Sequence, residues 1–379
     1  MDEDETRAWI ALALCAEGRP DQWLALAGRC GGAMAAARAS DADLAGRGAS
    51  PLAIARLRAA WPDRAARVAD RARRLGLGVS PFGGPGYPPR LTAIADPPLV
   101  LFWRGAEPSA SSPAVAIVGA RRATEYGERT ARRLGAEVAA AGIVVSSGLA
   151  RGIDAAAHRG ALETGRTTAV LAGGLDRIYP REHGSLADRI VASGGSLLSE
   201  QPPGVPALPW LFPYRNRIIT GLASATVVVE AAARSGSLAS ARHAIDQGRE
   251  VFAVPGPVDS PQSAGTNGLL RQGAAIFLEL CDLGVVDDIK AMIEKITLKN
   301  LEMQKIQEVE VSPEEALILA ALDGSPGTAD EISARTSLDG RRVLTFLTAL
   351  ELDGHVRREA HGTFRALARP RPAGASSSL

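Results

Sequence analysis

The densest group of side chains that could bind a ligand lies in the stretch FPYRNRIITGL, residues 212–222. Arg215 and Arg217 flank Asn216 here, and the planar guanidinium fork of arginine fits phosphate oxygens. Phe212 adds an aromatic face on which an unpaired base could stack. Taken alone, the cluster is also typical of a helix start with solvated charges, so its chemistry depends on the residues around it.

Turns rich in glycine, serine and arginine follow the strands predicted between residues 114 and 256. In open parallel α/β sheets such turns gather at the carboxyl edge, where ligands bind. Glycine lets the backbone approach a ligand closely, and helix N-termini offer unpaired N–H groups to anions. The sequence therefore predicts a phosphate-bearing ligand at this edge. The predicted binding residues in the turns are Gly119, Arg121, Arg122, Ser147, Gly148, Arg151, Ser235, Gly236 and Ser237.

The motifs of common nucleotide-using enzymes are missing from the sequence. The first predicted turn lacks G-x-G-x-x-G and no G-x-x-x-x-G-K-[ST] occurs, which argues against NAD and against the usual P-loop ATPases. The five histidines show no metal-ligand spacing. We therefore predict no catalytic residue, no metal and no cofactor.

Asp154 and Glu230 are the acids best placed for catalysis, because both lie near predicted strand ends. A helix-capping Asp and a loop-anchoring Glu explain them without a reaction. An enzymatic alternative stays open, namely a nucleotide N-glycosidase or phosphohydrolase that uses one of these carboxyl groups as general acid or base.

Six short, β-branched apolar runs alternate with helical stretches in the middle of the chain. Continuous apolar strands that alternate with helices are typical of a parallel sheet covered on both faces. We therefore predict an α/β core over residues 114–280 with a Rossmann-like, doubly wound parallel sheet. The strands are predicted at Ala114–Val118, Ile143–Val145, Thr168–Leu171, Ser196–Leu198, Thr226–Val229 and Val251–Val254.

The regions on either side of this core differ from it in composition. Residues 1–78 predict a small helical domain, similar to a SAM or helix-hairpin-helix domain. Residues 79–113 are rich in Pro and Gly and predict a linker that ends in a short strand at Leu99–Trp103. Residues 281–311 predict a helical linker of unusual composition, since all four lysines of the chain fall within 276–308, at Lys290, Lys295, Lys299 and Lys305.

The C-terminal residues 312–368 predict a winged helix that could contact double-stranded DNA or a protein. Capping boxes at Ser312–Glu315 and Thr328–Glu331 indicate two helix starts. The tail, residues 369–379, is predicted to be disordered. The expected helices are 313–322, 329–335 and 340–352, followed by β segments at His355–Arg358 and Thr363–Leu367.

Composition limits the class of protein. The 379 residues are 46% hydrophobic with a net charge of +1, so a site for a polyanion must be local rather than spread over the surface. Three cysteines far apart predict neither a disulfide framework nor a zinc site. The acidic N-terminus is unlike a signal peptide and no apolar run is long enough for a membrane helix, so we expect a cytoplasmic protein with no membrane contact.

Several long motifs, read in order, resemble the DNA-processing protein A (DprA, also called Smf) family. They cover nearly all of residues 114–275, and the flanking units resemble the family's accessory domains more loosely. The matching segments are AIVGARRATEYG, VVSSGLARGIDAAAHRGAL, AVLAGGLDRIYP, LLSEQPPG, FPYRNRIITGL, VVVEAAARSGSLASARHAIDQGREVFAVPG and GTNGLLRQGA.

The resemblance implies a non-enzymatic mediator of natural transformation and recombination. Family members bind and protect incoming single-stranded DNA, load the recombinase RecA onto it and act as homodimers. It implies that Arg121 and the Phe212–Arg217 stretch grip the DNA, and that the loops at Ser147–Gly148 and Ser235–Ser237 cradle phosphates. Leu269 and Leu270 are its candidates for self-association or RecA contact.

The chain departs from the family at one position beside the predicted site. Many relatives carry a basic residue three places before the pocket phenylalanine, where this chain has Pro209 followed by Trp210. One expected phosphate contact is thereby weakened.

Overall fold

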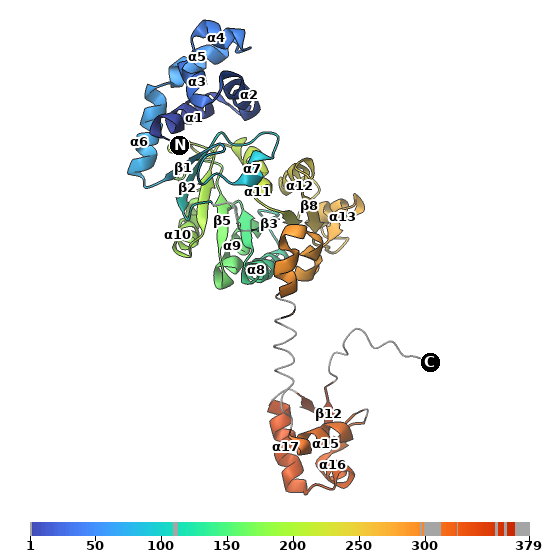
Figure 1. Cartoon of the computed structure of the whole chain (residues 1–379). Helices are drawn as coiled ribbons and strands as arrows, with labels where there is room; N and C mark the ends of the chain where they lie inside the picture. The colour runs from blue at the N-terminus through green and yellow to red at the C-terminus, as the bar shows by residue number, and fades with distance from the viewer. Residues whose placement is uncertain are drawn as a thin grey trace. The chain divides into compact units, whose positions relative to one another are not determined.

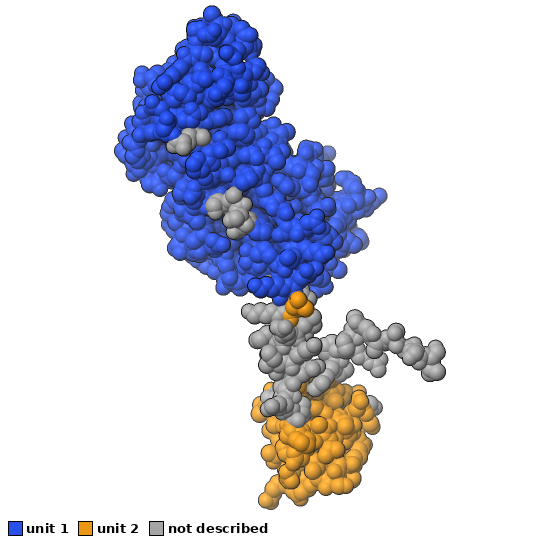
Figure 2. All heavy atoms as spheres, viewed as in Figure 1, with its two compact units in different colours: residues 1–297 blue, residues 298–379 orange. Residues whose placement is uncertain are grey.

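The computed structural model describes two compact units, residues 1–297 and 298–379 (Figures 1 and 2). The described residues are 2–108, 113–295, 298, 312–323, 325–352, 355–359 and 362–367. Within these ranges, no helix combines the length and the apolar composition that a bilayer crossing requires.

A nine-stranded sheet forms the centre of the first unit, in the order β1-β2-β6-β5-β4-β3-β7-β8-β9. The strands from β6 to β9 are parallel, so the predicted Rossmann-like sheet is confirmed and its six strands correspond to β3–β8. The bounds are β1 Gly78–Pro81, β2 Val100–Gly105, β3 Ala114–Val118, β4 Val144–Ser147, β5 Thr167–Val170, β6 Ser196–Ser199, β7 Ala225–Val228, β8 Glu250–Ala253 and β9 Ala275–Ile276.

The region predicted as a linker, residues 79–113, contributes two strands to this sheet. β2 pairs antiparallel with β6 and β1 pairs antiparallel with β2. Its loop is ordered by a buried tyrosine, since the Tyr87 hydroxyl donates to the Pro98 carbonyl at 2.7 Å. β1 was not predicted, because prolines and glycines usually argue against a strand. Proline is tolerated here because Pro81 is the last residue of an edge strand.

Helices cover both faces of the sheet, as a doubly wound fold requires. Side chains alternate along β3, so Val115 and Ile117 pack under α8 and α9 while Ala116 and Val118 pack under α11 and α12. The helices are α7 Pro89–Thr92, α8 Glu125–Ala140, α9 Ile153–Thr164, η1 Arg181–His183, α10 Gly184–Ala192, α11 Leu211–Gly221, α12 Ser237–Asp246 and α13 Ala264–Arg271 (Figure 1).

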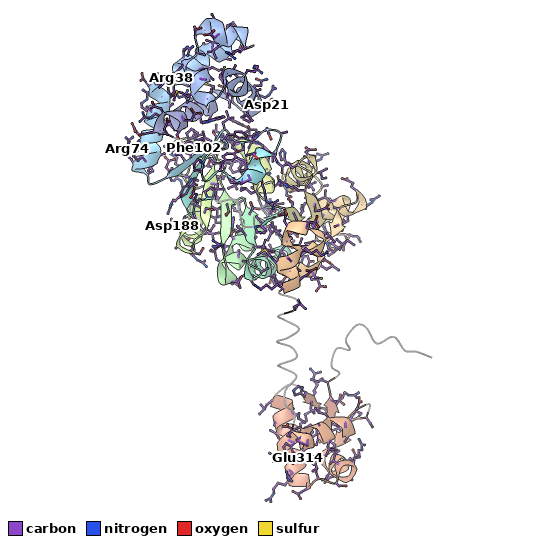
Figure 3. All side chains as sticks on the ribbon, viewed as in Figure 1. Asp21, Arg38, Arg74, Phe102, Asp188 and Glu314 are labelled. Carbon is purple, nitrogen blue, oxygen red and sulfur yellow. The ribbon has the colours of Figure 1, made fainter. Side chains whose placement is uncertain are left out.

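The N-terminal helices share a hydrophobic core with the antiparallel edge of the sheet. Trp9 and Ile10 of α1 belong to the same buried cluster as Leu99 and Phe102 of the β2 region, and Figure 3 labels Phe102. Residues 1–78 are helical as predicted, but they join the sheet in one compact unit. The helices are α1 Glu3–Cys15, α2 Pro20–Cys30, α3 Ala33–Arg38, α4 Asp41–Gly46, α5 Pro51–Ala60 and α6 Asp63–Arg74.

The segment of unusual composition starts as part of the core. η2 spans Leu280–Val285, residues 287–295 are helical, and Ile289 and Ile293 are buried in the cluster under α8. Residues 299–311 and the predicted disordered tail, 369–379, lie outside the described residues. The predicted helical linker is therefore described only over its first part.

The second unit has the three helices and small sheet of a winged helix, as predicted. Both capping boxes form, at Ser312–Glu315 and Thr328–Glu331. The sheet order is β10-β12-β11, and Ile318, Val343 and Phe364 lie in the core. The bounds are α15 Pro313–Ala321, β10 Gly327–Thr328, α16 Ala329–Thr336, α17 Gly340–Leu352, β11 Val356–Arg358 and β12 Thr363–Ala366.

Candidate functional site

A pocket of about 510 Å³ lies at the carboxyl edge of the parallel strands, and we call it the Arg121 pocket. It is where an open α/β sheet binds its ligand. Nine of the thirteen predicted binding residues line it. They are Gly119, Arg121, Arg122, Phe212, Arg215, Asn216, Ser235, Gly236 and Ser237.

Arg121 and Phe212 form the most ligand-like pair in the pocket. The guanidinium carbon of Arg121 lies 4.7 Å from the ring centroid of Phe212, a cation–π arrangement. Arg121 and Arg122 are both exposed and both line the pocket, so a ligand in the pocket can reach their side chains. The pair places a phosphate donor directly beside an aromatic face.

Tyr179 extends this aromatic surface and was not predicted as a site residue. Its ring centroid lies 5.4 Å from that of Phe212 at an interplanar angle of 61°, and 52% of its surface is exposed. Tyr179 stands six residues after the Gly173 turn, in the segment GGLDRIYP. The sequence signal that could have identified Tyr179 was an aromatic residue shortly after a glycine turn at the carboxyl edge of the sheet.

Ser235, Gly236 and Ser237 lie at the start of α12, on the pocket wall. The Ser235 and Ser237 hydroxyl groups are 2.7 Å apart, and the Ser237 N–H donates to the Ser235 hydroxyl at 3.3 Å. Gly236 is the N-cap and provides no side-chain cap, and the next two N–H groups also donate within the segment, Leu238 to the Ser235 carbonyl and Ala239 to the Gly236 carbonyl. The two hydroxyl groups are thus the polar groups that this segment presents on the pocket wall, and its role as a phosphate cradle stays a prediction.

Arg215 lines the pocket, but much of its guanidinium group is used by the fold. Its Nη1 donates to the Gly148 carbonyl at 2.9 Å and to the Val170 carbonyl. Burial lowers the pKa of Arg215 to about 10, so the group stays charged at neutral pH. Burial also raises the pKa of the neighbouring Asp154 carboxyl group, and the charge of Arg215 opposes that rise. Arg215 therefore fixes the ends of β4 and β5 as well as facing the pocket.

Arg217 was predicted to grip the ligand, and the structure corrects this. Its side chain is fully buried, with Nε donating to Asp96 at 2.9 Å and Nη2 to Glu200 at 2.7 Å. Its guanidinium carbon lies 3.9 Å above the ring centroid of Tyr214. Burial lowers the pKa of Arg217, but Glu200, Tyr214 and Asp96 outweigh it and hold the pKa above its ordinary value.

The helical period explains why the two arginines differ. In α11, Phe212 and Arg215 fall on the face toward the Arg121 pocket, whereas Tyr214 and Arg217 fall on another face. Two arginines separated by one residue in sequence therefore serve different surfaces. Arg217 is a residue that positions α11.

Ser147, Gly148 and Arg151 hold the β4–α9 turn behind the pocket. The buried Ser147 hydroxyl donates to the Ile117 carbonyl at 2.6 Å. A Cβ at Gly148 would lie 2.6 Å from the Asp154 carboxylate, so only glycine fits there. Arg151 pairs at the surface with Glu182, Nε to Oε1 at 2.6 Å. These contacts give the three predicted residues structural roles.

The two acids of the enzymatic alternative occupy different places. Glu230 is buried, and its carboxylate accepts from the Thr124 N–H at 2.8 Å and the Thr124 hydroxyl at 2.7 Å, which ties β7 to the start of α8. Asp154 lines the pocket but is also buried, and it accepts from the Ala150 N–H at 3.3 Å. Glu230 thus has the anchoring role expected without catalysis, whereas Asp154 does not cap a helix as expected, because it lies within the first turn of α9, whose N-cap is Gly152.

Two further regions were predicted to make contacts with a partner or with DNA. Leu269 is 8% exposed and belongs to the core, whereas Leu270 is half-buried on α13. At the start of α17 in the second unit, Arg341 is exposed, while Arg342 pairs with Glu314 at 3.0 Å. The choice between a DNA and a protein contact for the winged helix stays open.

A charged and aromatic pocket at the carboxyl edge of a doubly wound sheet has the chemical groups that recognise an anionic ligand. The family model described as DNA recombination-mediator protein A matches residues 79–285, and the DprA winged helix domain model matches residues 306–362. The chain belongs to the DNA recombination-mediator protein A family.

Curated relatives agree with this assignment. Protein Smf of Escherichia coli (strain K12) is 49% identical over 194 residues, which cover 51% of this chain and 52% of that protein. DNA processing protein DprA of Bacillus subtilis (strain 168) is 44% identical over 210 residues, covering 55% of this chain and 70% of that protein. The match thus spans about half the length of the Escherichia coli relative.

Two solved structures share the fold. DNA processing protein A from Streptococcus pneumoniae aligns with a TM-score of 0.64 at 31% identity and covers 73% of this chain and 96% of that one. DNA processing protein A from Helicobacter pylori aligns with a TM-score of 0.50 at 28% identity over 59% and 96% of the two chains. The Helicobacter pylori protein is described as having a unique single-stranded DNA binding mode.

We predict that Arg217→Ala lowers the free energy of unfolding of the 1–297 unit by about 3 kcal/mol. It leaves the mostly buried Glu200 carboxylate unpaired, and 3–5 kcal/mol is the range for breaking a buried ion pair. We use the low end because Asp96 is 38% exposed. Tryptophan fluorescence during denaturation measures this, since all five tryptophans lie in that unit.

The control is Arg129→Ala, which removes an exposed i,i+4 pair with Glu125. This change should cost no more than about 0.5 kcal/mol. An equally small loss for Arg217→Ala would contradict the structural role of Arg217.

Proposed function

We propose that this protein binds single-stranded DNA in the Arg121 pocket without strong sequence preference. The observation that carries the proposal is the Arg121 guanidinium group at 4.7 Å from the Phe212 ring, in a pocket of about 510 Å³. A guanidinium group neutralises a backbone phosphate, while an aromatic ring stacks any base through its π-face. The binding mode named for the Helicobacter pylori relative supports the same ligand.

The pocket favours a single strand over a duplex because its aromatic faces need unpaired bases. Phe212 and Tyr179 can reach a base only where it is free of a partner strand. The net charge of the chain is +1, so attraction to DNA comes from local groups such as Arg121 and Arg122. Affinity should therefore fall steeply with salt as bound counterions are released.

The protein acts on this DNA as a recombination mediator in natural transformation, protecting the strand and loading RecA onto it. Membership of the DNA recombination-mediator family supports this role, and holding a strand by backbone and base without cleaving it is the task such a mediator needs. The buried positions of Glu230 and Asp154 fit a protein that holds its ligand.

The chain acts as a homodimer through α13 and the neighbouring edge of the sheet. Leu270 is half-buried, and Ile276 and Leu278 follow it with 56% and 61% of their surfaces exposed. Apolar side chains beside an edge strand favour association. The core position of Leu269 leaves Leu270 as the residue of the pair that can meet a partner.

For DNA binding, we predict that Arg121→Ala combined with Phe212→Ala weakens binding of a labelled oligo-dT at least tenfold. The change removes a phosphate donor and a stacking surface, each of which contributes on the order of 1 kcal/mol or more. Fluorescence anisotropy over a salt series measures it, and the salt slope should fall by about 0.7 per lost phosphate contact. The control is Arg129→Ala, which removes an exposed arginine on α8. Submicromolar affinity in the double variant would contradict the proposed site.

For RecA loading, we predict that the protein accelerates the DNA-dependent ATP hydrolysis of RecA on a strand coated with single-strand-binding protein. The double variant of Arg121 and Phe212 should lose this effect because it releases the strand. If the wild-type protein left the rate of RecA ATP hydrolysis unchanged, the mediator role would be contradicted. The proposal that the protein binds single-stranded DNA would not be affected.

For self-association, we predict that Leu270→Glu converts the dimer to a monomer, since it places a charge in an apolar interface. Light scattering after size exclusion measures the mass. Leu52→Glu on α5, where Leu52 is 62% exposed, should leave the mass unchanged. A dimeric Leu270→Glu variant would place the interface elsewhere.

A further inference from the structure

A second cleft lies on the other side of α11, between the N-terminal helices and the sheet. Its volume is about 180 Å³, and we call it the Trp210 cleft. Aliphatic and aromatic side chains form much of its wall. The lining includes Ile10, Leu14, Leu99, Phe102, Trp210 and Tyr214.

Trp210 is the unusual residue of this cleft. Of the five tryptophans, all described by the structure, Trp9 and Trp23 are buried and Trp61 and Trp103 are half-buried, whereas 55% of Trp210 is exposed. An exposed tryptophan forgoes the stabilisation that burial of its large apolar surface would give. The exposed part of its ring is therefore available to a ligand in the cleft.

The opposite wall is held rigidly. Arg217 covers one face of the Tyr214 ring at 3.9 Å and donates to its hydroxyl group at 3.0 Å. Glu200, which holds Arg217 at 2.7 Å, lines the same cleft. The buried ion pairs that position α11 therefore also fix the shape of the cleft, so that a flat ligand would meet a preformed surface.

We propose that the Trp210 cleft takes an unpaired base from the same DNA strand that occupies the Arg121 pocket. The inference rests on the proposed DNA-binding function. Trp210 and Phe212 are two residues apart at the start of α11, one lining each site, so a strand passing over this helix end meets both aromatic rings. A cavity of about 150 Å³ accommodates benzene, and the cleft is somewhat larger and open, which suits one base.

The charged residues in the lining of the cleft are Arg64, Glu17 and Glu200, and of these Arg64 suits a connecting phosphate. Trp210 is the N-cap of α11 and makes no side-chain cap, so the helix carries its partial positive charge at the end from which Trp210 and Phe212 project. Arg64 of α6 is exposed and lines the cleft. Pro209 carries no charge and cannot contact a phosphate as a basic side chain would. Stacking on Trp210 would take the place of that contact with the strand.

The test compares Trp210→Ala, Trp210→Phe and Leu208→Ala in the full-length protein with labelled oligo-dT of about 20 nucleotides. Loss of one stacked base should weaken binding by Trp210→Ala on the order of five- to tenfold. Trp210→Phe should keep most of the affinity because it keeps an aromatic face. Leu208, 39% exposed on the same loop and outside the cleft lining, is the matched control and should bind as wild type.

A second readout does not depend on affinity. Addition of unlabelled oligo-dT should quench tryptophan fluorescence in the wild type, and Trp210→Phe should remove most of that quenching while it still binds. Wild-type affinity in a folded Trp210→Ala variant, or full quenching in Trp210→Phe, would overturn the proposal; the quenching test also decides if Trp210→Ala fails to fold. If Arg121→Ala with Phe212→Ala binds normally, the proposed function fails instead.

Discussion

The orientation of α11 depends on the buried guanidinium group of Arg217. It is held by the carboxylates of Asp96 and Glu200, which come from the loop before β2 and from the end of β6. A buried charge that loses its partners is costly, so α11 cannot rotate without breaking both pairs. Arg215 anchors the opposite face of the helix to main-chain carbonyl groups. Phe212 is presented to the pocket as a consequence of both anchors.

The arginines near the carboxyl edge divide into two kinds. Arg215 and Arg217 use their donors inside the protein and define the shape of the pocket. Arg121 and Arg122 are exposed and line the pocket. Because Arg215 and Arg217 hold the pocket in shape before a ligand arrives, less conformational entropy is lost when the ligand meets Arg121 and Arg122. A rigid scaffold increases affinity in this way without adding contacts.

The sheet could be predicted from the sequence because its signals are local. Six apolar β-branched runs and the turns after them identified β3–β8 and most of the pocket wall, including Arg121 and Gly236. β1 was missed since two- to four-residue edge strands beside prolines carry little pattern. The role of Arg217 was missed because its two partners are distant in sequence. Asp96 belongs to the region predicted as a linker, and Glu200 lies at the end of a strand. Burial of a charge is a property of the tertiary fold.

Helical periodicity offered part of the missing information. Once α11 is placed, Trp210, Tyr214 and Arg217 fall at intervals of four and three residues, on a face distinct from that of Phe212 and Arg215. The separation of these two faces of α11 matters for how the proposed DNA binding would depend on salt. Charge contacts weaken as salt rises because they displace counterions, whereas stacking on an aromatic ring releases none. If Trp210 stacks a base as proposed, a helix end that carries Pro209 and Trp210 in place of a basic residue would exchange a salt-sensitive contact for a salt-tolerant one, and binding there would persist where electrostatic attraction is screened.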